Sequence, residues 1–85
     1  MSKTDKLLQK IRNNPQSVSF EDLDKVLRVY GFEPRQPKGG SSHYFYQRSG
    51  FGQITVPRKK PFVKKIYVKD ALALIDEVIE REGLE

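Results

Sequence analysis

The spacing of apolar residues changes at Gly31, and this change divides the chain into helical and extended parts. The residues that recur every three or four positions before it are Phe20, Leu23, Val26, Leu27 and Tyr30. Such spacing lines one face of an α-helix. From Phe32 onward the period is two, which is typical of β-strands. Because helices often end in a left-handed residue, Gly31 predicts the end of this helix.

Three helices are expected. The one that ends at Gly31 begins after Ser19, whose hydroxyl suits an N-cap, with Asp22 three residues later. An earlier, short helix runs from about Lys3 to Asn13, is stopped by Pro15 and could be loosely attached. The last runs from about Val68 to Glu82, with residues 66–68 as a short apolar approach, Asp70 at its positive end and Gly83 as its stop.

Three strands are predicted between the second and third helices, at about 32–36, 42–48 and 53–56. Their short links indicate an antiparallel meander, and the glycine-rich link at 49–52 is short enough for a hairpin. If Ile54 and Val56 face the helices, Tyr44 and Tyr46 share that face, and His43, Phe45 and Gln47 point away; a shift of one residue would exchange the faces. The predicted fold is α+β, a two-layer domain in the order α-α-β-β-β-α with helices on one face of a three-stranded antiparallel sheet.

Chain length and composition limit the architecture. Eighty-five residues with 36% hydrophobic content suit one domain with a modest core. Residues 1–17 would form the short helix and a linker, and residues 18–82 the main body. The absence of cysteine excludes disulfides and thiolate metal sites. No apolar run approaches a membrane span or a leader segment, so we expect a soluble, cytoplasmic protein with no membrane partner.

Charge is distributed unevenly along the chain. No acidic residue lies between Glu33 and Asp70, whereas that stretch holds nine lysines and arginines. The rest of the chain carries seven basic and eleven acidic residues. A positive field of this kind attracts polyanions such as RNA. The alternative is that these side chains serve only solubility.

The only histidine, His43, follows a glycine pair and begins an aromatic segment. Imidazole exchanges protons near neutral pH, which suits general acid or base catalysis. The candidate ligands for phosphate are Arg35, Lys38, Arg58, Lys59, Lys60, Lys64 and Lys65, together with the backbone of Gly40, Ser41 and Ser42. The alternative is that a lone histidine is structural. Neither a metal nor another cofactor is expected, because one histidine, no cysteine and no nearby carboxylate leave zinc without ligands.

The aromatic run that follows His43 has two interpretations. Tyr44, Phe45 and Tyr46 could stack on unpaired bases. At least two of them are expected to belong to the sheet core instead.

Several motifs together resemble the HicA family of bacterial toxin–antitoxin systems over about residues 18–78. The matching segments are Val18-Ser19-Phe20-Glu21-Asp22-Leu23, Gly31-Phe32, Gly40-Ser41-Ser42-His43 followed by Phe45-Tyr46, Thr55-Val56-Pro57-Arg58, and Tyr67-Val68-Lys69-Asp70-Ala71-Leu72. The resemblance implies a fold like the double-stranded-RNA-binding domain. It also implies a toxin that cleaves mRNA without metal, with His43 as the catalytic residue, and a HicB-like antitoxin that covers its basic face.

Two features differ from the family pattern. Ser42 is interposed between Gly40-Ser41 and His43, and Arg58 and Lys59 follow Pro57 where many members carry a second histidine. The sequence leaves two other functions open. One is a non-catalytic RNA-binding module on the same fold, and the other is a protein-interaction domain without RNA affinity.

Overall fold

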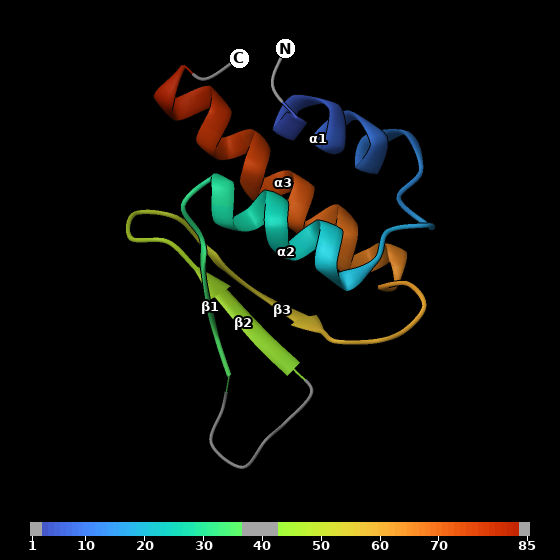
Figure 1. Ribbon diagram of the computed structural model, residues 1–85. Coiled ribbons are helices and arrows are strands. Elements are labelled where there is room, and N and C mark those ends of the chain that lie inside the picture. The colour runs from blue at the N-terminus through green and yellow to red at the C-terminus, as the bar shows by residue number, and fades with distance from the viewer. Residues whose placement is uncertain (1–2, 37–42, 84–85) are drawn as a thin grey trace.

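The computed structural model describes residues 3–36 and 43–83, where helices cover one face of an antiparallel sheet (Figure 1). The elements in chain order are α1 (Lys3–Asn13), α2 (Phe20–Val29), β1 (Glu33–Arg35), β2 (His43–Gln47), β3 (Gln53–Pro57) and α3 (Lys65–Glu82). Helices α2 and α3 lie against the sheet, and α1 packs beside them. The predicted α+β fold and the order α-α-β-β-β-α are confirmed. The strand bounds differ from the predicted ones by at most one residue at each end.

The sheet has the strand order β1-β2-β3, with both pairs antiparallel. Tyr44 pairs with Val56 and Tyr46 with Ile54. Tyr46 and Val56 are fully buried, and the Tyr44 ring centre lies 5.1 Å from that of Phe20 in α2. These side chains therefore face the helices, as the alternation in the sequence predicted, and at least two of the three consecutive aromatics belong to the core.

Helix α2 begins and ends where its sequence indicates. The Ser19 hydroxyl accepts a 3.2 Å hydrogen bond from the Asp22 amide, which is the predicted N-cap contact. Gly31 follows the helix with a φ of +88°, a conformation that favours glycine. The Arg48 guanidinium lies beside this turn and donates a 2.8 Å hydrogen bond to the Tyr30 carbonyl oxygen. The end of α2 is thus stabilised by the Arg48 side chain, directly after β2, as well as by its own backbone hydrogen bonds.

A polar contact crosses the interface between α2 and the sheet. The buried Tyr46 hydroxyl donates a 2.6 Å hydrogen bond to the Asp24 carboxylate. Arg28, one turn along α2, donates to both oxygens of the same carboxylate at 3.0 and 3.1 Å. Burial and the bond to Asp24 raise the pKa of Tyr46. This contact satisfies the only polar atom of a side chain that the core otherwise surrounds with apolar groups.

Helix α3 begins three residues earlier than predicted. Residues 66–68, expected as a short apolar approach to the helix, are helical, and the buried residues Val68, Ala71, Ile75 and Val78 follow helical spacing from the first turn. The predicted start was too late because Ile66 is exposed and Tyr67 only partly buried, so the first turn carries apolar residues away from the buried face. Asp70 therefore lies beyond the first turn, which contains no acidic residue, and its expected place at the positive helix end is wrong.

Helix α1 is part of the hydrophobic core. Leu8 and Ile11 are buried, and Arg12 forms an ion pair with Asp76 of α3. Beyond α1, the carbonyl oxygen of Val18 accepts a 2.8 Å hydrogen bond from the amide of Val63, which lies in the connection between β3 and α3. The side chains of both valines are buried. Helix α1 is therefore packed against the main body and contributes to its core.

The hairpin between β2 and β3 is fastened to the end of α3. The guanidinium groups of Arg48 and Arg81 both lie over the Phe51 ring. The guanidinium carbon of each is 4.9 Å from the ring centre. Arg81 also donates a 2.8 Å hydrogen bond to the Gly50 carbonyl oxygen, and Arg48 pairs with Glu82. These contacts fix the hairpin at the end of the sheet remote from His43.

Candidate functional site

His43 is the first residue of β2, and its side chain is exposed. Because Tyr44 and Tyr46 point to the helices, the alternation of the strand turns His43 to the other side. Its register partner is Pro57, the last residue of β3. The sheet pairing therefore brings the imidazole next to the basic segment that begins at Arg58.

A hollow of about 370 Å³ lies at this end of the sheet. Its lining residues are His43, Pro57, Arg58, Lys59, Lys64 and Tyr67. We call it the His43 pocket. Among the described residues that line it are three cations, one imidazole and one phenol, and no carboxylate. Such a set is suited to a phosphate group with a proton donor or acceptor beside it.

The N-terminal end of α3 adds to the positive potential of the His43 pocket. Lys64 is the N-cap residue of this eighteen-residue helix, and Tyr67 lies in its first turn. Free amides at a helix N-terminus carry partial positive charge. The absence of an acidic residue in the first turn of α3 leaves that charge uncompensated locally.

Arg58 is oriented by aromatic side chains beneath it. Its guanidinium carbon lies 5.8 Å from the ring centre of Phe20, which in turn packs on Tyr44. An arginine over an aromatic ring keeps its donors available at the edge of the guanidinium plane. The core side of the sheet thus positions one of the three cations of the pocket.

The structure brings together only some of the residues predicted for the site. Arg58, Lys59 and Lys64 join His43, whereas the exposed Lys60 and Lys65 do not line its pocket, and Arg35 lies on β1 in another hollow. The predictions for Lys38, Gly40, Ser41 and Ser42 fall outside the described residues.

Sequence reasoning missed Tyr67 as a pocket residue. It was assigned to a short apolar approach before the helix, so its side chain could not be placed. Once α3 is taken to begin at Lys65, the three-residue spacing from Lys64 to Tyr67 puts the two on one side of the helix start.

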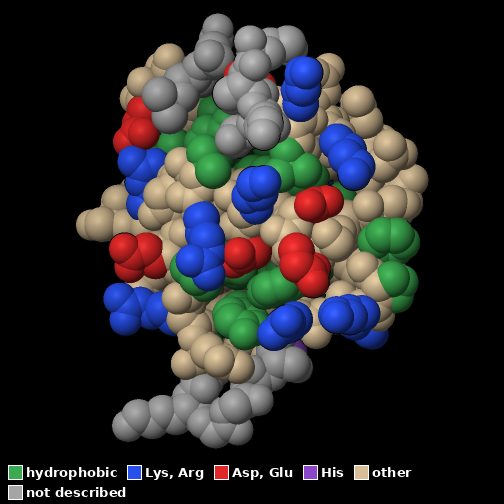
Figure 2. All heavy atoms as spheres, viewed as in Figure 1, with side chains coloured by type: hydrophobic (Ala, Val, Ile, Leu, Met, Phe, Trp, Pro, Cys, Tyr) green, Lys and Arg blue, Asp and Glu red, His purple; other side chains and the backbone are tan. Residues whose placement is uncertain are grey.

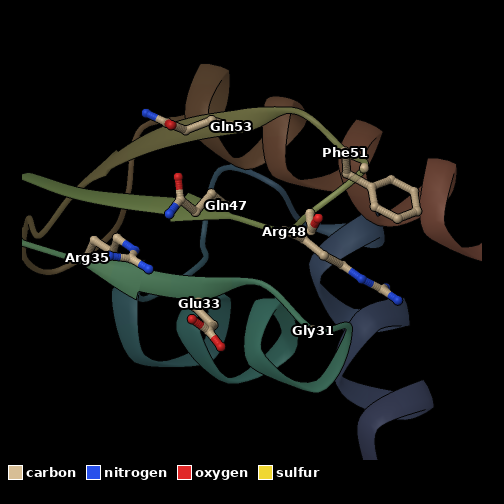
Figure 3. Close-up of a pocket in the computed structure, with 9 residues that line it drawn as sticks. Gly31, Glu33, Arg35, Gln47, Arg48, Phe51 and Gln53 are labelled. Carbon is tan, nitrogen blue, oxygen red and sulfur yellow. The ribbon is translucent and has the colours of Figure 1, made fainter.

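A second hollow, of about 640 Å³, lies at the hairpin end of the sheet (Figure 3). Its lining residues are Gly31, Glu33, Arg35, Gln47, Arg48, Ser49, Gly50, Phe51 and Gln53. We call it the hairpin hollow. It differs from the His43 pocket in containing a carboxylate and two amide side chains, and its Arg48 is already paired with Glu82.

Charge over the helical part of the molecule is mixed. In Figure 2, drawn from the side of Figure 1, Lys and Arg side chains alternate with Asp and Glu where the helices lie. Ion pairs account for part of this pattern, including Arg28 with Asp24 and Arg81 with Glu77. The acid-free lining of the His43 pocket is therefore a local feature and not a general property of this surface.

Residues 3–36 and 43–83 contain neither a metal-binding cluster nor a membrane-spanning helix. No group of three or more His, Cys, Asp or Glu side chains is placed to hold a metal ion. No helix in these ranges combines the length and apolar character needed to cross a bilayer.

Comparison with models of protein families, with curated proteins and with solved structures gave no match for this chain.

Proposed function

We propose that this protein is a metal-independent endoribonuclease that cleaves mRNA, acting as the toxin of a toxin–antitoxin pair of the HicA type. The observation that supports this most directly is the His43 pocket. There an exposed imidazole shares one hollow with Arg58, Lys59 and Lys64. The resemblance of the sequence motifs to the HicA family supports the same function.

The proposed reaction is an internal transfer on the RNA backbone. The 2′-hydroxyl loses its proton, its oxygen forms a bond to phosphorus, and the bond from phosphorus to the 5′-oxygen breaks. The departing 5′-oxygen takes up a proton. The products are therefore a 2′,3′-cyclic phosphate and a 5′-hydroxyl. His43 supplies one of the two proton transfers and water supplies the other, while the cations stabilise the extra negative charge on the phosphate.

The expected size of the His43 contribution follows from its role. A positioned general acid or base accelerates a reaction about 10²- to 10⁴-fold. The cations and the fixed geometry would add to this by stabilising charge and orienting the phosphate. Loss of the imidazole should therefore reduce the rate strongly while RNA binding continues.

The test is digestion of RNA in EDTA by the wild-type protein and by His43→Ala. We expect the variant to be about 10²- to 10⁴-fold slower and the wild-type fragments to end in 2′,3′-cyclic phosphate. A suitable control is Lys10→Gln, which removes an exposed charge from α1. Equal cleavage by wild type and His43→Ala would refute the catalytic role.

The non-catalytic alternative has a different outcome in the same experiment. A plain RNA-binding module would bind RNA in a salt-sensitive way, produce no cyclic phosphate ends and retain its affinity in His43→Ala. The pocket cations favour RNA binding in either case. The fragment ends therefore decide between the two functions.

We further propose a HicB-like antitoxin as the protein partner. A partner that covers Arg58, Lys59 and Lys64 with acidic groups would block phosphate access to His43. A toxin that acts on mRNA would work in the cytoplasm. Co-expression with an antitoxin encoded beside it should restore growth, and the isolated complex should not cleave RNA.

A further inference from the structure

The open face of the sheet presents three rows of side chains across the strands. In register, the first row is Glu33, Gln47 and Gln53, the second is Arg35, Phe45 and Thr55, and the third is His43 and Pro57. Neighbouring rows are two residues apart along each strand, or about 6.5 to 7 Å. His43 and Pro57, which line the His43 pocket, therefore lie at the opposite end of the open face from the first row, which lines the hairpin hollow.

Phe45 occupies the middle of this surface. It belongs neither to the buried core nor to the partly buried residues that pack against the core, unlike Tyr44 and Tyr46 on either side of it. Its side chain is half-buried on the central strand, between Arg35 and Thr55 in register. An outward aromatic ring at this place is available to a flat ligand such as a nucleobase.

The first row has the chemistry of base recognition. Figure 3 shows Glu33, Gln47 and Gln53 on the same side of the sheet, and all three line the hairpin hollow. Each glutamine amide offers both donors and an acceptor, and the carboxylate offers acceptors. These groups complement the edges of unpaired bases. The Glu33 carboxylate would repel a phosphate, so the two hollows favour different parts of a nucleotide chain.

We propose that the open face binds the unpaired bases of a single-stranded RNA whose scissile phosphate occupies the His43 pocket. The base nearest the cut stacks on Phe45, and the next base is read by Gln47, Gln53 and Glu33. One row spacing is comparable to the step between successive phosphates of an extended strand, so the three rows accommodate about two nucleotides beyond the cut. This inference rests on the proposed ribonuclease function and adds the substrate class and the specificity residues.

Single-stranded RNA is favoured over a duplex by the position of Phe45. Bases inside a duplex are stacked on each other and their pairing edges are occupied, so neither a ring nor an amide can reach them. The surface between the two hollows therefore suits bases that have been splayed out of a helix or that were never paired.

Binding is tested with short 2′-O-methyl oligonucleotides, which lack the attacking hydroxyl and cannot be cut. Each carries one 2-aminopurine, whose fluorescence falls when it stacks. The proteins are wild type, Phe45→Leu, Phe45→Tyr, the double variant Gln47→Ala/Gln53→Ala, and Gln9→Ala as a control on the exposed side of α1. Thermal melts confirm that each variant is folded.

We expect wild type, Phe45→Tyr and Gln9→Ala to bind and to quench the probe. Phe45→Leu should bind about 5- to 100-fold more weakly and lose the quenching. With unmodified RNA, the double variant should lose the base preference two nucleotides from the cut. Unchanged affinity and quenching in Phe45→Leu, or equal binding of a duplex of the same sequence, would overturn the inference.

The two proposals fail in distinguishable ways. If wild type binds and quenches the uncut oligonucleotide in a Phe45-dependent way but does not cleave unmodified RNA, the base-binding face stands and the ribonuclease fails. If wild type cleaves through His43 while the Phe45 and glutamine variants keep its affinity and base preference, the ribonuclease stands and the base-binding face fails. If wild type binds no RNA, both fail.

Discussion

His43 in β2 lies opposite Pro57 in β3, at the last pair of the sheet register. A strand that ends in proline cannot donate a further backbone hydrogen bond there, so the chain leaves the sheet at this point. The cations that follow Pro57 therefore start beside the imidazole. The proximity of His43 and Pro57, which are fourteen residues apart in sequence, is thus set by strand pairing and not by a local motif.

The cations of the His43 pocket should control the salt dependence of RNA binding. Replacing Arg58, Lys59 and Lys64 together by glutamine should reduce the slope of log affinity against log salt by about 2 for a single strand. A matched control is the triple glutamine variant of Lys6, Lys10 and Lys25, which has the same net charge and changes exposed residues of α1 and α2. Equal slopes for the two triple variants, measured by fluorescence anisotropy, would contradict a phosphate role for the pocket.

Tyr46→Phe should destabilise the fold moderately. The variant loses the 2.6 Å hydrogen bond to Asp24, but Arg28 still binds that carboxylate, so no charge is left unpaired. We expect a loss of about 1 to 1.5 kcal/mol in the free energy of unfolding, measured in urea. A loss above about 3 kcal/mol would show that the ring as well as the hydroxyl had lost its packing.

The same tyrosine predicts a loss of stability in alkali. Burial and the hydrogen bond to Asp24 raise the pKa of Tyr46 in the folded state, whereas the unfolded chain releases this proton near pH 10. The folded state then binds more protons, so stability from this group is full below pH 10 and falls above it by up to about 1.4 kcal/mol per pH unit. Urea unfolding between pH 8 and 11 should show the gap between wild type and Tyr46→Phe narrowing above pH 10.

Gly31 and Gly50 have nearly equal φ angles but different surroundings. Comparing alanine substitutions at the two positions therefore distinguishes the cost of backbone strain from the cost of a steric clash. Gly31 has a φ of +88° and Gly50 one of +87°. A Cβ on Gly31 would lie 3.1 Å from Arg48 Nε, whereas one on Gly50 would meet nothing within 4 Å. Gly50→Ala should cost about 1 to 2 kcal/mol from the left-handed conformation alone. Gly31→Ala should cost about 1 kcal/mol more, because Arg48 must leave the Tyr30 carbonyl. Equal melting temperatures would contradict this role of Arg48.

Ile11→Ala should show that α1 is integral to the fold. The side chain is 1% exposed, and its truncation should cost about 2 to 5 kcal/mol. Gln9→Ala, on the exposed side of the same helix, should change stability by less than about 0.5 kcal/mol. If both variants unfold at the same urea concentration, α1 contributes little to the core.

The sequence predicted the parts of the fold that depend on local chemistry. Ser19 and Gly31 mark the ends of α2 because capping and left-handed residues act within one turn of the chain. Alternation placed Tyr46 in the core and His43 outside because the period of a strand is fixed at two. The start of α3 was placed three residues too late because the consecutive apolar residues 66–68 do not show the spacing of a single helix face, although only Val68 among them is buried.

Which residues line the His43 pocket depends on tertiary contacts, and these cannot be predicted from the composition of a segment. A run of basic residues from Arg58 to Lys65 offered five candidates of similar chemistry, and only the path of the chain separates Arg58, Lys59 and Lys64 from Lys60 and Lys65. Tyr67 joined the pocket through the helix start. Predicting that Glu33, Gln47 and Gln53 form one row on the open face would have required the register of all three strands.

The hydrogen bond from the Val63 amide to the Val18 carbonyl oxygen fixes the far end of the segment that carries Arg58 and Lys59, two of the three pocket cations. Sheet pairing at Pro57 fixes its near end, so residues 58–62 form a span of set length between two anchors. Exchanging one residue for another on such a span alters the charge it presents and leaves the path intact. Inserting or deleting a single residue instead changes the path on which Arg58 and Lys59 lie relative to the imidazole and to Lys64, so this segment should tolerate a change of composition far better than a change of length.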